Sequence, residues 1–160
     1  MFGALAAISD VTMSVRPGER RAVLGSNGAG KTTLFNCVTG DFLSTSGTIR
    51  LFGEDVTSIP ACERIRRGPR RTYQISLLFG EPASGLSPTE RQDLVAILTG
   101  LPGHIGYIII EHDMDVALRV AESVTMMHNG RIFKEGTPLE IENDPEVQAL
   151  YLGDGSHAHA

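Results

Sequence analysis

Short apolar runs alternate with segments of helical periodicity along this chain, and glycines lie between many of them. Residues 20–24 end in three apolar residues and predict a strand, and residues 31–39 predict a helix that ends at Gly40. The glycines between these two elements therefore lie in a strand-to-helix turn. Residues 48–52 predict a further strand, and the basic residues 64–71 show no periodicity, which indicates a loop with a solvated surface.

The second half of the chain continues the alternation. Residues 75–79 are apolar apart from Ser76, and residues 107–110 are a fully apolar run that predicts a buried strand. Two capping boxes, at residues 87–90 and 137–140, carry Pro at the first helical position and predict helix starts. The first of these helices runs to about Leu101. Its apolar positions recur at helical spacing: Leu94, Ile97, Leu98 and Leu101.

A helix and a hairpin complete the pattern. Asp113 can cap a helix that runs through Ala121. Asn129 and Gly130 predict a two-residue turn between strands at residues 124–128 and 132–135. This alternation of strands and helices predicts an α/β domain with a mainly parallel sheet flanked by helices and an antiparallel hairpin near the C-terminus. Its ligand site should lie at the carboxyl ends of the strands.

Length, charge and cysteine spacing argue against several classes of function. A chain of 160 residues, 41% of them hydrophobic, fits one domain with one core. The net charge of -5 argues against a nucleic-acid partner, which usually meets a basic face. No stretch is apolar enough to span a bilayer and the N-terminus lacks a signal-peptide pattern, so we expect a cytoplasmic chain. Cys37 and Cys62 show no spacing typical of a zinc site or a disulfide framework.

The strongest local motif is GSNGAGKT at residues 25–32, which fits GxxxxGK[ST] between a strand and a helix. Glycines let backbone N–H groups surround a phosphate, Lys31 can reach the β and γ oxygens, and Thr32 can offer a hydroxyl to Mg²⁺. A glycine-rich turn with a solvated lysine is the plainer alternative. We predict a P-loop NTPase-like fold that binds ATP. The predicted nucleotide-binding residues in this region are Gly25, Ser26, Asn27, Gly28, Ala29, Gly30, Lys31, Thr32 and Thr33.

Several longer motifs extend this picture: GSNGAGKTTLFNCVTG, RRTYQ, EPASGLSP, IIIEHDMDVALRVAESVTMMHNGRIFKEGTP and DPEVQALYLG. Over residues 11–39 and 81–153 the chain resembles the ATP-binding subunits of ATP-binding-cassette (ABC) importers, especially those for branched-chain amino acids or urea. The resemblance implies an ATPase that pairs with a second ATP-binding subunit and with membrane permease subunits. It also implies a place at the inner face of the cell membrane.

The resemblance assigns roles to single residues. Phe2 would stack on adenine. Gln74 would face both Mg²⁺ and the membrane subunit, and Thr32 would also bind Mg²⁺. Glu81 would be the general base, and His112 would contact the γ-phosphate. A carboxylate can polarise the attacking water and an imidazole can hold both water and phosphate oxygen. Alternatively, Phe2 is a frayed terminal residue, Glu81 is solvated, and His112 only ends a buried strand.

The chain also departs from the family pattern. Only residues 75–80 stand between Gln74 and Glu81, where the family has a helical subdomain with its signature motif. We therefore expect residues 1–153 to form a truncated nucleotide-binding domain and residues 154–160 to be a disordered tail. In addition, Gly80 replaces the aspartate that would hold the Mg²⁺ water shell, which should weaken metal binding.

The short connection creates a geometric conflict. Two parallel strands need a crossover of about a dozen residues or more, so Gln74 and Glu81 cannot both end parallel strands beside the phosphates. We predict one strand over residues 73–79, with Glu81 near the site and Gln74 displaced. Two functions stay open: an ATPase subunit that powers import, and a remnant that binds nucleotide without hydrolysis or coupling to a permease.

Overall fold

The computed structural model describes residues 7–66, 76–80, 83 and 85–155. Its strands are β1 Arg20–Leu24, β2 Arg50–Leu51, β3 Glu54–Asp55, β4 Ser76–Gly80, β5 Gly106–Glu111, β6 Ser123–His128 and β7 Arg131–Gly136. Its helices are α1 Lys31–Thr39, α2 Ala61–Arg66, α3 Pro88–Thr99, α4 Met114–Val120, α5 Pro138–Glu142 and α6 Pro145–Gly155. No helix within these described ranges is long and apolar enough to cross a membrane.

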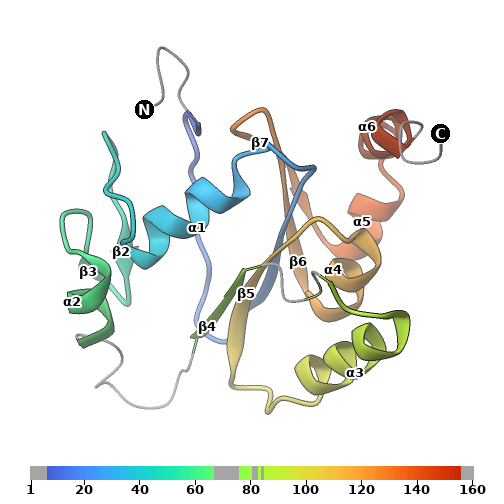
Figure 1. The fold of residues 1–160 in the computed structure, drawn as a ribbon, viewed down its shortest axis with the longest axis horizontal. Coiled ribbons are helices and arrows are strands. Elements are labelled where there is room, and N and C mark those ends of the chain that lie inside the picture. Colours follow the sequence, from blue (N-terminus) through green and yellow to red (C-terminus); the bar gives the residue numbers. More distant parts are fainter. Residues whose placement is uncertain (1–6, 67–75, 81–82, 84, 156–160) are drawn as a thin grey trace.

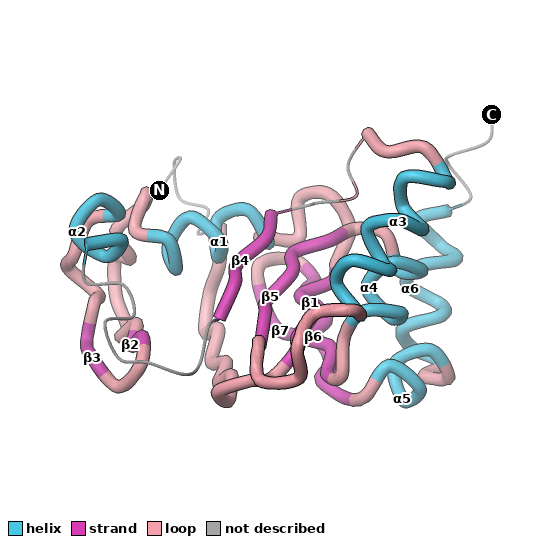
Figure 2. Tube along the Cα trace, turned by 90° about the horizontal axis from the view of Figure 1, so that it is seen from below, coloured by secondary structure: helices cyan, strands magenta, loops and turns pink. Residues whose placement is uncertain are grey.

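The main sheet has the strand order β4-β5-β1-β6-β7. Its first four strands are parallel, and β7 pairs antiparallel with β6 through the Asn129–Gly130 turn. Both turn residues have positive φ angles, 49° and 74°, which suits the twist of a two-residue hairpin. Figures 1 and 2 show α1 on one face of the sheet and α3 to α6 on the other. The predicted α/β architecture with a C-terminal hairpin is confirmed.

Alternation along β1 divides the core between the two faces, because successive strand residues point to opposite sides. Ala22 and Leu24 pack in the cluster formed with α3, α4, α5 and α6. Val23 packs in the opposite cluster with Leu34 of α1. These three residues of β1 are each 0% exposed, and β1 is the middle strand of the sheet, so it lies at the centre of a two-faced core.

Local signals placed most of these elements correctly. β1 and α1 have the predicted bounds, and Gly40 ends α1 in the left-handed conformation with φ 91°. Both capping boxes are formed: Ser87 with Glu90 opens α3, and Thr137 with Glu140 opens α5. α4 begins after Asp113, whose side chain accepts the Val116 N–H.

Three expectations need correction. The predicted strand over residues 48–52 is only β2, because Phe52 and Gly53 turn back with φ 53° and 83° into β3 in a separate two-stranded sheet. Ile97 lies on the exposed side of α3 with 65% exposure, because only one side of this helix packs against the domain. α6 runs to Gly155, beyond residue 153, and residues 156–160 lie outside the described part.

A fourth correction concerns Arg64, for which the sequence predicts a solvated loop. Residues 64–66 end α2, and Arg64 is only 6% exposed. Its guanidinium donates to the carbonyl oxygens of Cys37 and Val38 at 2.6 and 2.7 Å, and to that of Ile59 at 2.6 Å. The last carbonyls of a helix have no partner within the helix, so Arg64 satisfies the end of α1. Residues 67–71 of the basic stretch lie outside the described residues.

Candidate functional site

The phosphate-loop motif lies between β1 and α1, at the carboxyl edge of the central strand (Figure 1). Gly28 and Gly30 have φ angles of 85° and 100°, and the Ala29 N–H donates to the Ser26 carbonyl at 3.1 Å. These positive angles are open to glycine and strained for other residues. The glycine spacing therefore produces a tight turn, as the motif predicts.

The two sides of this loop differ in the space around them. A Cβ added at Gly25 would lie 2.6 Å from the Met127 carbonyl oxygen, and one added at Gly30 would lie 2.7 Å from the Ile8 side chain. A Cβ added at Gly28 would meet no atom within 4 Å. The loop is thus closed on the side of β6 and the N-terminal segment, and open at Gly28.

The Asn129–Gly130 turn supports the loop from the side of β6. The Gly130 N–H donates to the Ala29 carbonyl at 2.9 Å, and the Gly130 carbonyl accepts the Ser9 N–H at 2.8 Å. The sequence predicted this hairpin turn but carried no signal that it contacts the phosphate loop. The contact joins three segments that are far apart in the chain.

Lys31 begins α1 and is only 3% exposed. Its ammonium donates to the carbonyl oxygens of Gly25 and Ser26 at 2.7 and 3.1 Å. A positive charge is therefore enclosed by the loop, beside the N–H groups at the start of a helix, which together favour an anion. Thr32, at the next position of α1, is exposed.

The sheet register brings a second segment beside the loop. Leu24, which precedes Gly25, pairs with Glu111 of β5, and Gly80 at the end of β4 pairs with Ile110. Neighbouring strands lie about 4.8 Å apart, so His112, which follows Glu111, comes directly beside the phosphate-loop strand. His112 is exposed. Phe2, Gln74 and Glu81 lie outside the described residues, as do residues 73–75 of the predicted strand.

Glu111 is a residue that sequence reasoning missed. Its side chain is 0% exposed and accepts the backbone N–H groups of Ala83, His112 and Asp113 at 2.7, 3.2 and 3.3 Å. The only available signal was its position as a charged residue directly after the apolar residues 107–110. These bonds tie Ala83, three residues after β4, to the segment after β5.

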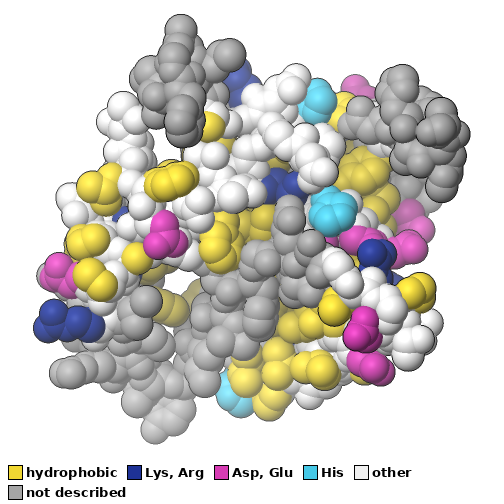
Figure 3. Space-filling view, viewed as in Figure 1, with side chains coloured by type: hydrophobic (Ala, Val, Ile, Leu, Met, Phe, Trp, Pro, Cys, Tyr) yellow, Lys and Arg dark blue, Asp and Glu magenta, His cyan; other side chains and the backbone are white. Residues whose placement is uncertain are grey.

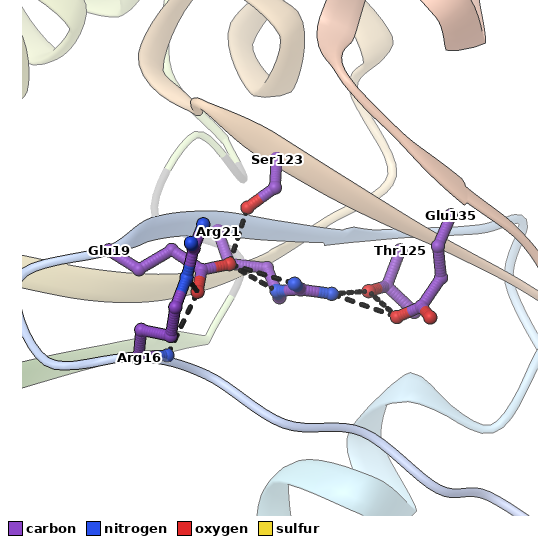
Figure 4. Close-up of polar contacts among 6 residues, drawn as sticks. All are labelled: Arg16, Glu19, Arg21, Ser123, Thr125 and Glu135. Atoms are coloured by element: carbon purple, nitrogen blue, oxygen red, sulfur yellow. Dashed lines mark hydrogen bonds and ion pairs between the residues drawn. The ribbon is translucent and has the colours of Figure 1, made fainter.

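A polar network occupies the opposite end of β1 (Figure 4). Glu19, just before β1, accepts hydrogen bonds from the Ser123 hydroxyl, the Arg16 N–H and the Arg21 guanidinium. Burial raises the pKa of Glu19, but these bonds outweigh it and lower the pKa to about 2. Arg21 also donates to Thr125 and Glu135. The network therefore joins β1, β6 and β7 away from the phosphate loop, which indicates a structural role.

On the face seen in Figure 3, Lys and Arg side chains of the described residues lie apart from one another. The enclosed Lys31 lies at the carboxyl edge of the parallel sheet, a position that suits a small anionic ligand.

A parallel sheet whose central strand leads through this glycine loop into a helix defines a P-loop NTPase-like protein. The family model described as "ABC transporter" matches residues 8–140. The chain therefore belongs to the ABC transporter family.

One curated relative resembles this chain in sequence, and two solved structures resemble it in fold. The branched-chain amino acid transport ATP-binding protein BraF of Pseudomonas aeruginosa is 25% identical over 240 aligned positions, which cover 96% of this chain and 94% of BraF. A crystal structure of the ADP conformation of MJ1267, an ATP-binding cassette, has a TM-score of 0.83 at 20% identity, covering 95% of this chain and 94% of that one. A dimeric post-hydrolysis structure of the cassette MJ0796 bound to ADP and Pi has a TM-score of 0.71 at 15% identity, covering 84% and 91%.

The alignment with BraF is itself informative. Its 240 positions exceed the 160 residues of this chain by 80, so at least that many positions have no counterpart here. Nevertheless, nearly the whole of both chains is covered. Within the matched length, this chain therefore lacks residues that BraF has.

Proposed function

We propose that this chain is the ATP-binding subunit of an importer for branched-chain amino acids and binds ATP with Mg²⁺ at its phosphate loop. The observation that carries the proposal is the enclosure of the Lys31 ammonium, 2.7 Å from the Gly25 carbonyl oxygen, by the loop that follows the central strand of the sheet. The transport class rests on the likeness to BraF.

The described loop fits a phosphate group. The open position at Gly28 leaves space for phosphate oxygens. At Gly25 and Gly30 the loop backbone lies close against β6 and the N-terminal segment. Lys31 would contact the β and γ oxygens, and the loop N–H groups would surround the β-phosphate. The Thr32 hydroxyl would bind Mg²⁺, which neutralises phosphate charge, and Gln74 is the other proposed metal contact.

Two side chains are proposed for hydrolysis. His112 follows β5 beside the phosphate-loop strand, so its imidazole is the group that would hold the γ-phosphate and the attacking water. Glu81 follows Gly80 in the sequence and is the proposed general base. Phe2 is the proposed contact for adenine. A second ATP-binding subunit and permease subunits at the inner face of the membrane are the proposed partners.

A second candidate function is a remnant that binds nucleotide without hydrolysing it or driving transport. The observation that favours it is the shortfall of 80 aligned positions, together with the six residues that separate Gln74 from Glu81. Gly80 ends β4 where the family pattern has an aspartate, which removes a carboxylate from the Mg²⁺ environment. In this second function the phosphate loop still binds nucleotide, but the binding does not drive transport.

A titration with a fluorescent ATP analogue, with and without Mg²⁺, tests both functions when phosphate release is followed in the same samples. Lys31→Ala removes the enclosed charge. Lys134→Ala is the matched control because Lys134 is the other lysine of the chain and lies on β7.

Two outcomes each support one function, and a third contradicts both. Binding that requires Lys31, with phosphate release that disappears in Glu81→Gln, supports the transport ATPase. Binding that requires Lys31 without phosphate release supports the remnant. Binding that is equal in wild type, Lys31→Ala and Lys134→Ala would show that the phosphate loop is not the site.

A further inference from the structure

Glu111 is a buried charged residue that the proposed reaction does not use directly. Its carboxylate is 0% exposed, and within the described part of the chain its hydrogen-bond partners are three backbone N–H groups. A buried carboxylate is costly unless hydrogen bonds compensate for lost water. Three donors on two oxygens provide that compensation and fix where each donor lies.

The donors belong to two different segments. Ala83, 2% exposed, follows β4, whereas His112 and Asp113 follow β5. The Ala83 N–H is bound to Oε1 at 2.7 Å, and the N–H groups of His112 and Asp113 are bound to Oε2 at 3.2 and 3.3 Å. One side chain therefore sets the distance between these two backbone segments.

A second path joins the same segments through α3. The Leu86 N–H donates to the Ala83 carbonyl at 3.2 Å, and the Leu86 carbonyl accepts from Arg91 of α3 at 3.2 Å. Arg91 also forms an ion pair with Asp113, which caps α4 through the Val116 N–H. The contacts form a closed ring from Ala83 through Arg91 and Asp113 to Glu111.

We propose that Glu111 is a positioning residue that holds the backbone at Ala83, three residues after β4, in a set position relative to His112, beside the phosphate loop. The inference rests on the proposed function, in which Glu81, two residues before Ala83, and His112 both act at the γ-phosphate. Glu111 acts through the backbone N–H groups of Ala83, His112 and Asp113.

Comparison of ATP with ADP separates this role from simple stabilisation. ADP lacks the γ-phosphate, so its affinity depends on the phosphate loop and not on the placement of His112. A protein that is only less stable should lose affinity for both nucleotides in proportion. A protein with a misplaced segment should lose affinity for ATP alone.

Glu111→Gln is the first variant because it keeps the size of the side chain and replaces one acceptor oxygen by a donor that faces an N–H group. We expect the Kd for ADP to change less than about twofold and the Kd for ATP to rise about tenfold, as the loss of one buried acceptor implies. Glu142→Gln, an exposed change on α5, is the control and should alter neither Kd.

Arg91→Gln provides a second variant that does not disturb the buried carboxylate, since the Arg91 side chain is 41% exposed. It removes the ion pair between Arg91 and Asp113, and we expect a rise of about threefold in the Kd for ATP and not in the Kd for ADP. In the wild type, the Ala83 amide should be protected from hydrogen exchange. Exchange of that amide at the rate of an unstructured peptide would overturn the proposal without any variant.

The outcomes distinguish this inference from the function on which it rests. Lys31-dependent ADP binding with an ATP-specific loss in both variants supports the positioning role. Lys31-dependent ADP binding with equal changes for both nucleotides, or with none, overturns the positioning role alone. ADP binding that does not depend on Lys31 overturns both.

Discussion

The backbone N–H of Gly130 donates a hydrogen bond of 2.9 Å to the carbonyl oxygen of Ala29, which joins the β6–β7 turn to the phosphate loop. The same glycine has a φ angle of 74°, and a Cβ there would lie 2.6 Å from the Ala7 carbonyl oxygen. The turn is therefore shaped to fit between the loop and the N-terminal segment.

Replacement of this glycine should damage both stability and the loop. We expect Gly130→Ala to lower the free energy of unfolding by about 2 kcal/mol, because alanine is strained at this φ and its Cβ meets backbone. Nucleotide affinity should fall as well. Urea denaturation measures the first effect. Gly103→Ala is the control, because a Cβ there meets nothing within 4 Å, and a Gly130→Ala protein as stable as this control would contradict the argument.

Lys31 should be required for nucleotide binding. Removal of a charged group that pairs with phosphate costs about 2 kcal/mol or more, so Lys31→Ala should raise the Kd for ATP at least about thirtyfold. Calorimetric titration against Lys134→Ala checks this value. Equal Kd values in the two variants would refute the assignment of the loop as the phosphate site.

Arg64 should matter for stability and not for nucleotide chemistry. Arg64→Met leaves the carbonyls of Cys37, Val38 and Ile59 without their donor, and a loss of about 3 kcal/mol in the free energy of unfolding is expected. Arg66→Met is the matched control because Arg66 is exposed at the end of the same helix. Similar denaturation midpoints for the two variants would disprove the structural role of Arg64.

Glu19 should make stability depend on pH in the acid range. Its pKa is lowered from 4.5 to about 2 in the folded protein, so its contribution is present above pH 4.5 and is lost as pH falls towards 2. A shift of this size corresponds to at most about 3 kcal/mol. Glu19→Gln should therefore be less stable than wild type at pH 7, and the difference should shrink on acidification. A difference that is constant with pH would contradict this account.

Elements with strong local signals could be predicted from the sequence, and contacts between distant segments could not. Gly40 ends α1, and Ser87 caps α3, because each conformation depends on neighbours within one helical turn. Arg64 was misjudged because its partners are the end carbonyls of a helix that begins at Lys31. The charge of Arg64 predicts that its side chain is exposed to solvent, whereas the forked N–H donors of its guanidinium fit those carbonyl oxygens.

The same distinction between local and distant contacts applies to the candidate site. The phosphate loop follows from a contiguous motif, and its strand-to-helix setting is confirmed by β1 and α1. Glu111 could not be recognised in advance because its role depends on the register of β5 with β1 and on the return of the chain at Ala83. The roles of Phe2, Gln74 and Glu81 stay predictions.

The two cysteines differ in a way that makes the chain convenient for spectroscopy. Cys37 is buried in α1, and burial raises the pKa of its thiol, whereas Cys62 is exposed on α2. A maleimide dye should therefore attach selectively at Cys62. Arg64, two residues further on, holds the end of α1, and α1 begins at the phosphate loop. A dye at Cys62 would therefore report the binding of unmodified nucleotides from the far end of that helix.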